Sequence, residues 1–158
     1  MSILLELIIL TFLPFLELRA SIPYGIFASN IHWFWIFVIC CLTNIILSFF
    51  VYAFVNYVMK LFLKVKFINK IYEKIVERSQ RKVKPYVDKY GTIGLAIFIG
   101  IPLPGSGVYT GGLGAYLLGF KFKDYIIASI IGVLIAGTIV TLVSVTGSEA
   151  LYFMLKVI

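Results

Sequence analysis

Residues 13–25 read LPFLELRASIPYG, which places a glutamate, an arginine and two prolines inside a very apolar region, after LIILTF and before WFWIFVICCL. Proline removes a backbone donor and clashes with the preceding turn, so Pro14 and Pro23 are each expected to end or kink a helix. About ten apolar residues on either side of a break would cover ~15 Å, half of the hydrocarbon core of a bilayer. Residues 3–29 are therefore predicted to form two half-length helices, as a re-entrant hairpin or a discontinuous span.

A second interrupted stretch covers residues 91–119, where IPLPGSG breaks an apolar and glycine-rich region. Its prolines and glycines are typical of a chain that cannot continue as a helix. Further along, Gly111 and Gly114 are small residues that either admit a closely packed neighbour or face a substrate. The residues predicted as structural breaks in the two stretches are Pro14, Gly107 and Gly111.

Two other stretches, residues 33–59 and 125–148, contain no charged residue and are long enough to cross a bilayer. Of the 158 residues, 61% are hydrophobic and 13% are charged. Soluble domains are nearer to about a quarter charged. We therefore predict an all-α integral membrane protein with one membrane domain, residues 1–158.

The stretch 60–90 carries ten Lys or Arg residues against three Asp or Glu residues, an excess equal to the net charge of +7 for the whole chain. Ile68, Ile71 and Ile75 recur at helical spacing among these charges, which predicts an amphipathic helix at the membrane surface. In a membrane protein such a cluster indicates the cytoplasmic side and contact with anionic lipid rather than with nucleic acid. The expected location is a cytoplasmic membrane, with several passes.

The order of a broken segment and a clean span occurs twice, in residues 1–59 and in residues 91–158, with the basic stretch 60–90 between them. Transporters commonly consist of two such repeats with opposite orientation. Non-helical backbone at membrane depth is tolerated where it lines protein or a water-filled cavity. The predicted fold is therefore a pair of inverted repeats, each with a re-entrant hairpin and a transmembrane helix.

The orientation follows from charge. If residues 60–90 are cytoplasmic, the span 33–59 runs inward, and Lys121 and Lys123 are also expected inside. Residues 91–119 must then enter and leave on the same face, which favours the inverted arrangement. If both broken segments crossed the bilayer fully, the two halves would be parallel and these lysines would lie outside.

Glu17 and Arg19 are the candidate functional pair, because ionisable residues at membrane depth are costly and mark transport pathways. An extended, proline-flanked segment would let both side chains project to one side, near the midplane. Arg19 offers a fork of donors to phosphate or carboxylate, and helix N-termini at the breaks could add amide donors. Partial burial would favour the neutral form of Glu17, which could exchange protons or attract a cation. Alternatively, the two residues only pair with each other or lie near the interface.

The other polar residues and the two cysteines are weaker indications of function. Asn44 and Asn56 are expected to link helices through hydrogen bonds. Cys40 and Cys41 are adjacent in an apolar run and do not face each other on a helix, so neither a disulfide nor a metal site is expected. We expect no cofactor and no enzymatic activity, since the chain has one histidine and lacks a cluster of acidic metal ligands. A homodimer is compatible with so few spans.

The segments ELRASIPYGI (17–26) and IPLPGSGVYTGGLGAYLLG (101–119) resemble the small multidrug export protein family, which is related to the DedA-like (VTT-domain) superfamily. The resemblance covers nearly the whole chain. It implies two re-entrant hairpins that face each other from opposite leaflets, and movement of lipids such as polyprenyl phosphates with proton coupling.

The resemblance also assigns site residues. The acidic and basic pair of the family corresponds to Glu17 and Arg19, but the second loop lacks the arginines of DedA proteins and has Ser106 in that region. The predicted substrate- or ion-binding residues are Glu17, Arg19, Pro23, Pro102, Pro104, Gly105 and Ser106.

Three functions are compatible with the sequence. The first is a proton-linked transporter or flippase for an amphipathic lipid or polyprenyl phosphate, which depends on Arg19. The second is export of hydrophobic cations, in which Glu17 binds drug and proton alternately. The third is a membrane scaffold or assembly factor without transport, in which both residues act only on stability.

Overall fold

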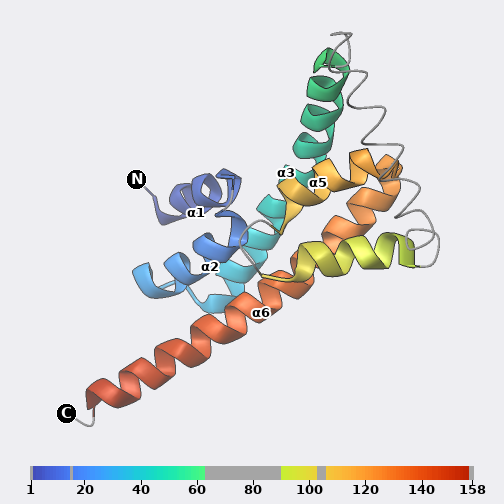
Figure 1. The fold of residues 1–158 in the computed structure, drawn as a ribbon. Coiled ribbons are helices and arrows are strands. Elements are labelled where there is room, and N and C mark those ends of the chain that lie inside the picture. Colours follow the sequence, from blue (N-terminus) through green and yellow to red (C-terminus); the bar gives the residue numbers. More distant parts are fainter. Residues whose placement is uncertain (1, 15, 63–89, 103–105, 157–158) are drawn as a thin grey trace.

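The computed structural model describes residues 2–14, 16–62, 90–102 and 106–156, which form six helices and contain no strand (Figure 1). One helix, Tyr90–Gly100, is called helix 90–100 below. The other helices are α1 (Ile3–Phe12), α2 (Glu17–Ala28), α3 (Trp33–Phe62), α5 (Val108–Leu117) and α6 (Phe122–Lys156). The all-helical prediction is confirmed for these residues.

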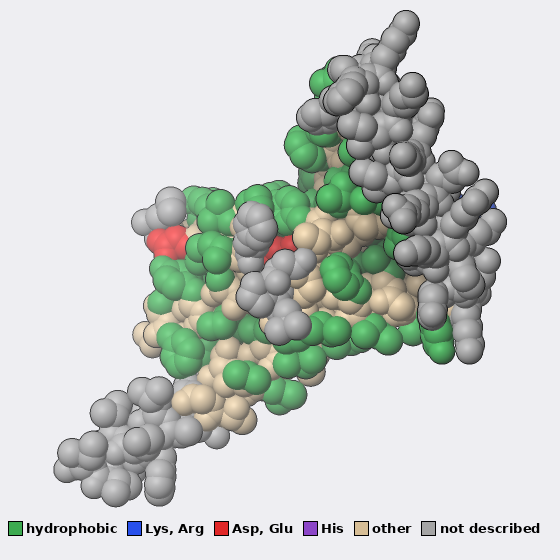
Figure 2. Space-filling view, viewed as in Figure 1, with side chains coloured by type: hydrophobic (Ala, Val, Ile, Leu, Met, Phe, Trp, Pro, Cys, Tyr) green, Lys and Arg blue, Asp and Glu red, His purple; other side chains and the backbone are tan. Residues whose placement is uncertain are grey.

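Two helices are long and apolar enough to cross a membrane: α3 over Trp33–Met59 and α6 over Phe122–Gly147. At 1.5 Å per residue each covers about 40 Å, which exceeds a hydrocarbon core of about 30 Å. Large apolar side chains such as Phe54 and Val143 are exposed on them. Hydrophobic side chains also cover most of the described surface in Figure 2. Such a surface is stable in lipid rather than in water.

The predicted span 33–59 lies within α3, and the predicted span 125–148 lies within α6, which begins three residues earlier. α6 starts at Phe122, because Gly119 adopts a positive φ of 76° and turns the chain before it. Lys123 and Asp124 then lie in the first turn, where the acidic residue is favourable near the positive end of the helix dipole.

Both segments predicted to be broken are interrupted helices. Leu13 ends α1 in an extended conformation just before Pro14, and α2 begins at Glu17. In the second segment the chain leaves helix 90–100 and re-enters a helix at Val108, after Gly107. Pro23 was expected to end or kink a helix; it lies inside α2 and does not end it. A proline inside a helix removes one hydrogen bond but can be accommodated where neighbouring helices pack around it.

The two pairs of short helices lie on opposite sides of the crossing of α3 and α6 (Figure 1). The element order short helix, break, short helix, long helix therefore occurs twice in the described residues. Whether the two halves are inverted, and whether the breaks are re-entrant, stays a prediction. The basic helix predicted within 60–90 falls almost wholly outside the described residues.

Glycines allow the long helices to pack closely. A Cβ on Gly137 of α6 would lie 2.6 Å from Cys41 Sγ of α3, and one on Gly132 would lie 2.7 Å from the Ala96 carbonyl oxygen. Gly111 similarly admits Ile99, with a Cβ at 2.6 Å from Cγ1, so it is a packing residue inside α5 rather than a break. By contrast, a Cβ on Gly114 would meet no atom within 4 Å, so Gly114 does not admit a neighbour.

We expect Gly132→Ala to lower stability by about 1–3 kcal/mol, because its methyl group would overlap backbone in helix 90–100 that cannot move aside easily. Thermal unfolding of the purified protein in detergent measures this. Gly147→Ala is the matched control, since a Cβ there meets nothing within 4 Å. Equal melting temperatures for the two variants would contradict the packing described here.

Candidate functional site

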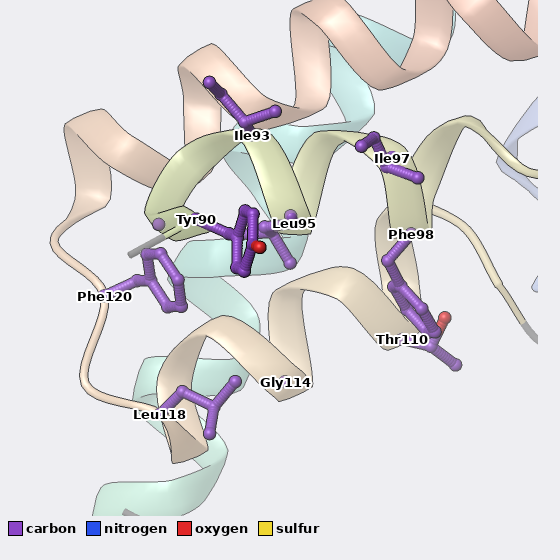
Figure 3. Close-up of a pocket in the computed structure, with 11 residues that line it drawn as sticks. Tyr90, Ile93, Leu95, Ile97, Phe98, Thr110, Gly114, Leu118 and Phe120 are labelled. Atoms are coloured by element: carbon purple, nitrogen blue, oxygen red, sulfur yellow. The ribbon is translucent and has the colours of Figure 1, made fainter. Parts of the chain in front are cut away.

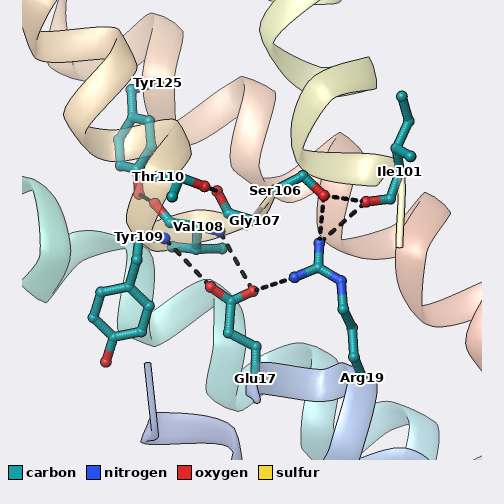
Figure 4. Close-up of polar contacts among 9 residues, drawn as sticks. All are labelled: Glu17, Arg19, Ile101, Ser106, Gly107, Val108, Tyr109, Thr110 and Tyr125. Atoms are coloured by element: carbon teal, nitrogen blue, oxygen red, sulfur yellow. Dashed lines mark hydrogen bonds and ion pairs between the residues drawn. The ribbon is translucent and has the colours of Figure 1, made fainter. Parts of the chain in front are cut away.

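The two breaks meet at Glu17 and Arg19 (Figure 4). Both side chains leave the first turn of α2 and reach the second break, where the chain passes from helix 90–100 into α5. The carboxylate and the guanidinium are largely buried, with exposed fractions of 5% and 13%. The site is therefore an acid–base pair enclosed between segments more than 80 residues apart in sequence.

The Glu17 carboxylate binds the N-terminus of α5. Oε2 accepts from the Val108 N–H at 3.4 Å, and Oε1 accepts from the Tyr109 N–H at 3.3 Å. These amides belong to the first turn of α5, where backbone donors lack helical partners and the helix dipole favours negative charge. Such a helix end is an anion-binding site, and here the anion is a side chain of the same protein.

Arg19 connects the same carboxylate to the other edge of the second break. Its Nη1 lies 3.6 Å from Glu17 Oε2, and its Nη2 donates to the Ile101 carbonyl and to Ser106 Oγ, each at 3.1 Å. The Ser106 hydroxyl donates in turn to the Ile101 carbonyl at 2.5 Å. Nε is buried and has no hydrogen-bond partner in the residues that the structure describes. The Nε–H group of Arg19 is therefore a donor that none of these contacts uses.

The backbone that brings Glu17 and Arg19 together differs from the prediction. We expected an extended segment, but the chain is helical from Glu17 onward, and residues two apart normally diverge on a helix. Glu17 has a positive φ of 46°, which turns its side chain out of the regular helical direction. This conformation is strained for a residue with a Cβ, and such strain is concentrated at functional sites.

Gly107 makes room for the pair. A Cβ at this position would lie 2.5 Å from Glu17 Oε2 and 2.9 Å from Arg19 Nη1. Its backbone, with φ 152° and ψ −167°, is in a region open almost only to glycine. Gly107 thus allows the carboxylate to approach the first amides of α5.

The remaining predicted residues are divided between the site and other places. Ser106 belongs to the site, and Pro14 lines the cavity beside it. Pro102 lies in the second break without a described contact to the pair, whereas Pro23 lies further along α2. Pro104 and Gly105 fall outside the described residues.

Several residues of the site were not predicted. Tyr109 contributes its amide to Glu17, and its hydroxyl donates to the Phe12 carbonyl at 2.6 Å, linking α5 to the end of α1. Tyr125 donates to the Val108 carbonyl at 2.9 Å and fixes the same turn. A sequence does not show which backbone amides will donate to a side chain. The two tyrosines could not be distinguished from ordinary residues of an apolar helix.

Asn44 of α3 was expected to link helices through a hydrogen bond, and the described residues show no such bond of ordinary geometry. The side chain is fully buried, with 0% exposure, and neither of its polar atoms has a hydrogen-bond partner among the residues that the structure describes. It lies beside Glu17 within electrostatic reach, although the two groups do not make a hydrogen bond of ordinary geometry. Since an unpaired buried amide is costly, Asn44 is a feature that stability alone does not explain.

A cavity of about 190 Å³ opens at the pair. Its polar wall consists of Glu17, Arg19, Ser106 and Thr110, and Leu113 completes the apolar side. This volume is enough for several water molecules or a small head group, since one water occupies about 30 Å³ in the liquid. Within the residues that the structure describes, no group of three or more His, Cys, Asp or Glu residues could hold a metal ion.

These features define an α-helical membrane protein with a buried acid–base pair between two interrupted helical segments. Residues 17–139 match the family described as "Putative small multi-drug export protein", and the chain belongs to that family. The matched region begins at Glu17, includes α2, α3, the second break and α5, and ends about halfway along α6. Comparison with curated proteins and with solved structures found no match.

Proposed function

We propose that this protein is a membrane transporter for amphipathic molecules with an anionic head group, and that the head group takes the place of the Glu17 carboxylate. The observation that carries the proposal is the set of donors around that carboxylate: two α5 amides and the Arg19 guanidinium. On the other side, the Ser106 hydroxyl accepts from Arg19 and helps to hold the guanidinium in place. Phosphate and carboxylate groups fit such donors.

Transport requires the substrate to leave as well as to bind. In the proposed cycle, protonation of Glu17 or its displacement by the head group frees the donors, and return of the ionised carboxylate expels the substrate. Competition between two anions for one set of donors thus links substrate movement to the charge of Glu17. The proton coupling and lipid movement implied by the resemblance to DedA-like proteins are consistent with this cycle.

The membrane topology is part of the proposal. The basic stretch 60–90 faces the cytoplasm and contacts anionic lipid. The two breaks enter from opposite faces and lie near the midplane of a cytoplasmic membrane. Substrate would then reach the site alternately from either side.

A second candidate is export of hydrophobic cations, which the description of the family favours. In that cycle Glu17, which lines the cavity, would bind the cation or a proton. The close engagement of its carboxylate by donors argues for an anionic substrate instead, because a cation would have to draw Glu17 away from all of them.

The test compares three probes of equal chain length in proteoliposomes: dodecyl phosphate, dodecyl trimethylammonium and an uncharged dodecyl glycerol ether. We expect wild-type protein to move the phosphate fastest. Arg19→Gln should reduce that rate by about 10- to 100-fold, the value of one lost charge-assisted hydrogen bond. Faster movement of the ammonium probe would favour the second candidate, and movement of none would favour a scaffold.

Asn44 is proposed to receive the Glu17 carboxyl group when it leaves α5. Asn44→Leu keeps the number and branching of the side-chain heavy atoms and removes a buried amide that has no partner among the described residues, so we expect unchanged or higher thermal stability together with about tenfold slower transport. Thermal unfolding and flux of dodecyl phosphate measure the two effects. Ser129→Ala is the control, since Ser129 is another buried polar side chain without a hydrogen bond of ordinary geometry in the described part of the chain. Normal transport by Asn44→Leu would contradict this role.

A further inference from the structure

An apolar groove lies between helix 90–100 and α5 (Figure 3). Its volume of about 470 Å³ is within the range of roughly 300–1,000 Å³ that is usual for small-molecule sites. The groove is much larger than the cavity at Glu17 and Arg19, and its walls are almost wholly apolar. Residues that line it include Tyr90, Phe98, Thr110, Gly114, Leu118 and Phe120.

The groove and the polar cavity share a wall. Thr110, in the first turns of α5, lines both of them. In Figure 3, Thr110 and Phe98 lie at one end of the groove, whereas Tyr90 and Phe120 lie at the other. The cavity that holds Arg19 therefore lies beside the Thr110 end of the groove, and aromatic rings line the far end.

We infer that this groove binds the hydrocarbon tail of the amphipathic anion whose head group binds at Arg19. The inference rests on the proposed function and adds a second subsite to it. A tail starting at Thr110 would run along α5 to Leu118, over about 12 Å at 1.5 Å per residue. Each methylene group kept in apolar contact would stabilise the complex, and the length of the groove would set the preferred chain length.

Gly114 forms an open part of the groove. A Cβ at this position would meet no atom within 4 Å, whereas Gly111 and Gly112 of the same helix are packed against Ile99 and Val51. A side chain added at Gly114 would therefore extend into free space without displacing a neighbour. Because glycine is the least favourable non-proline residue inside a helix, its replacement should not weaken α5.

The first experiment measures flux of dodecyl phosphate and hexyl phosphate into proteoliposomes. We expect Gly114→Leu to slow the dodecyl probe about tenfold, the loss for roughly two methylene groups excluded from the groove. Hexyl phosphate should be affected much less. Gly147→Leu is the matched control, because this glycine of α6 is equally open. Equal effects on both probes, or no effect on the dodecyl probe, would overturn the inference while leaving Arg19-dependent transport intact.

The second experiment measures binding without transport. Dodecyl phosphate with a photoreactive diazirine at the tail end should label wild-type protein near Tyr90 and Phe120. Gly114→Leu and Arg19→Gln should each reduce this labelling. Labelling that persists in Arg19→Gln would indicate ordinary membrane lipid in the groove and would overturn the inference. Equal flux of both phosphates in wild type and in Arg19→Gln would instead refute the proposed function.

Discussion

Gly107→Ala should abolish most of the transport activity while leaving the protein folded. The added methyl group would lie 2.5 Å from Glu17 Oε2 and 2.8 Å from Oε1, so the carboxylate could no longer reach the first amides of α5. The backbone at φ 152° would also be strained by about 1–3 kcal/mol for any residue with a Cβ. We expect dodecyl phosphate flux to fall by about 100-fold, since two charge-assisted hydrogen bonds are affected.

Gly147→Ala serves as the control for Gly107→Ala, because it introduces the same methyl group into open space on α6. Flux is measured in proteoliposomes with equal amounts of folded protein, verified by gel filtration and thermal unfolding. A Gly107→Ala protein that folds and transports at the wild-type rate would mean that the approach of Glu17 to α5 has no role in transport.

Glu17→Gln is expected to have the second large effect. The neutral amide cannot compete with an anionic head group for Arg19 and the α5 amides, so the substrate would bind but not be expelled. We expect flux to fall by about 100-fold. Stability without substrate should fall by about 3 kcal/mol, because Arg19 would lose its partner in a largely buried position.

The control for Glu17→Gln is Glu6→Gln, which changes another acidic residue of the same region. Glu6 accepts a hydrogen bond from the Tyr24 hydroxyl at 2.6 Å and has no described contact with the second break. We expect its flux to stay within about twofold of wild type, in keeping with the small effects of exposed polar contacts. Similar losses in both variants would point to a general effect of charge rather than to the site.

Much of the fold follows from local sequence features. The uncharged stretch from Trp33 to Met59 predicts its own span, and Pro14 predicts the first break. For Pro23 the sequence left two outcomes open, the end of a helix or a kink within one, and the residue lies inside α2. Helix packing around it, which the sequence does not reveal, decides between the two outcomes.

The candidate site was only partly predictable. Glu17 and Arg19 were recognisable because charged residues are rare in such a sequence. Their partners were not, because Val108 and Tyr109 contribute backbone amides and Gly107 contributes only space. A prediction of these contacts needs the distance between α2 and α5, which depends on packing across the whole domain.

The most direct test of the account is the affinity of dodecyl phosphate for Glu17→Ala protein in lipid nanodiscs. If the head group and the carboxylate compete for the same donors, removal of the carboxylate should lower the Kd about tenfold relative to wild type. The Glu17→Ala, Arg19→Gln double variant should lose this gain. Weaker or unchanged binding by a folded Glu17→Ala protein would contradict the claim that the substrate takes the place of Glu17.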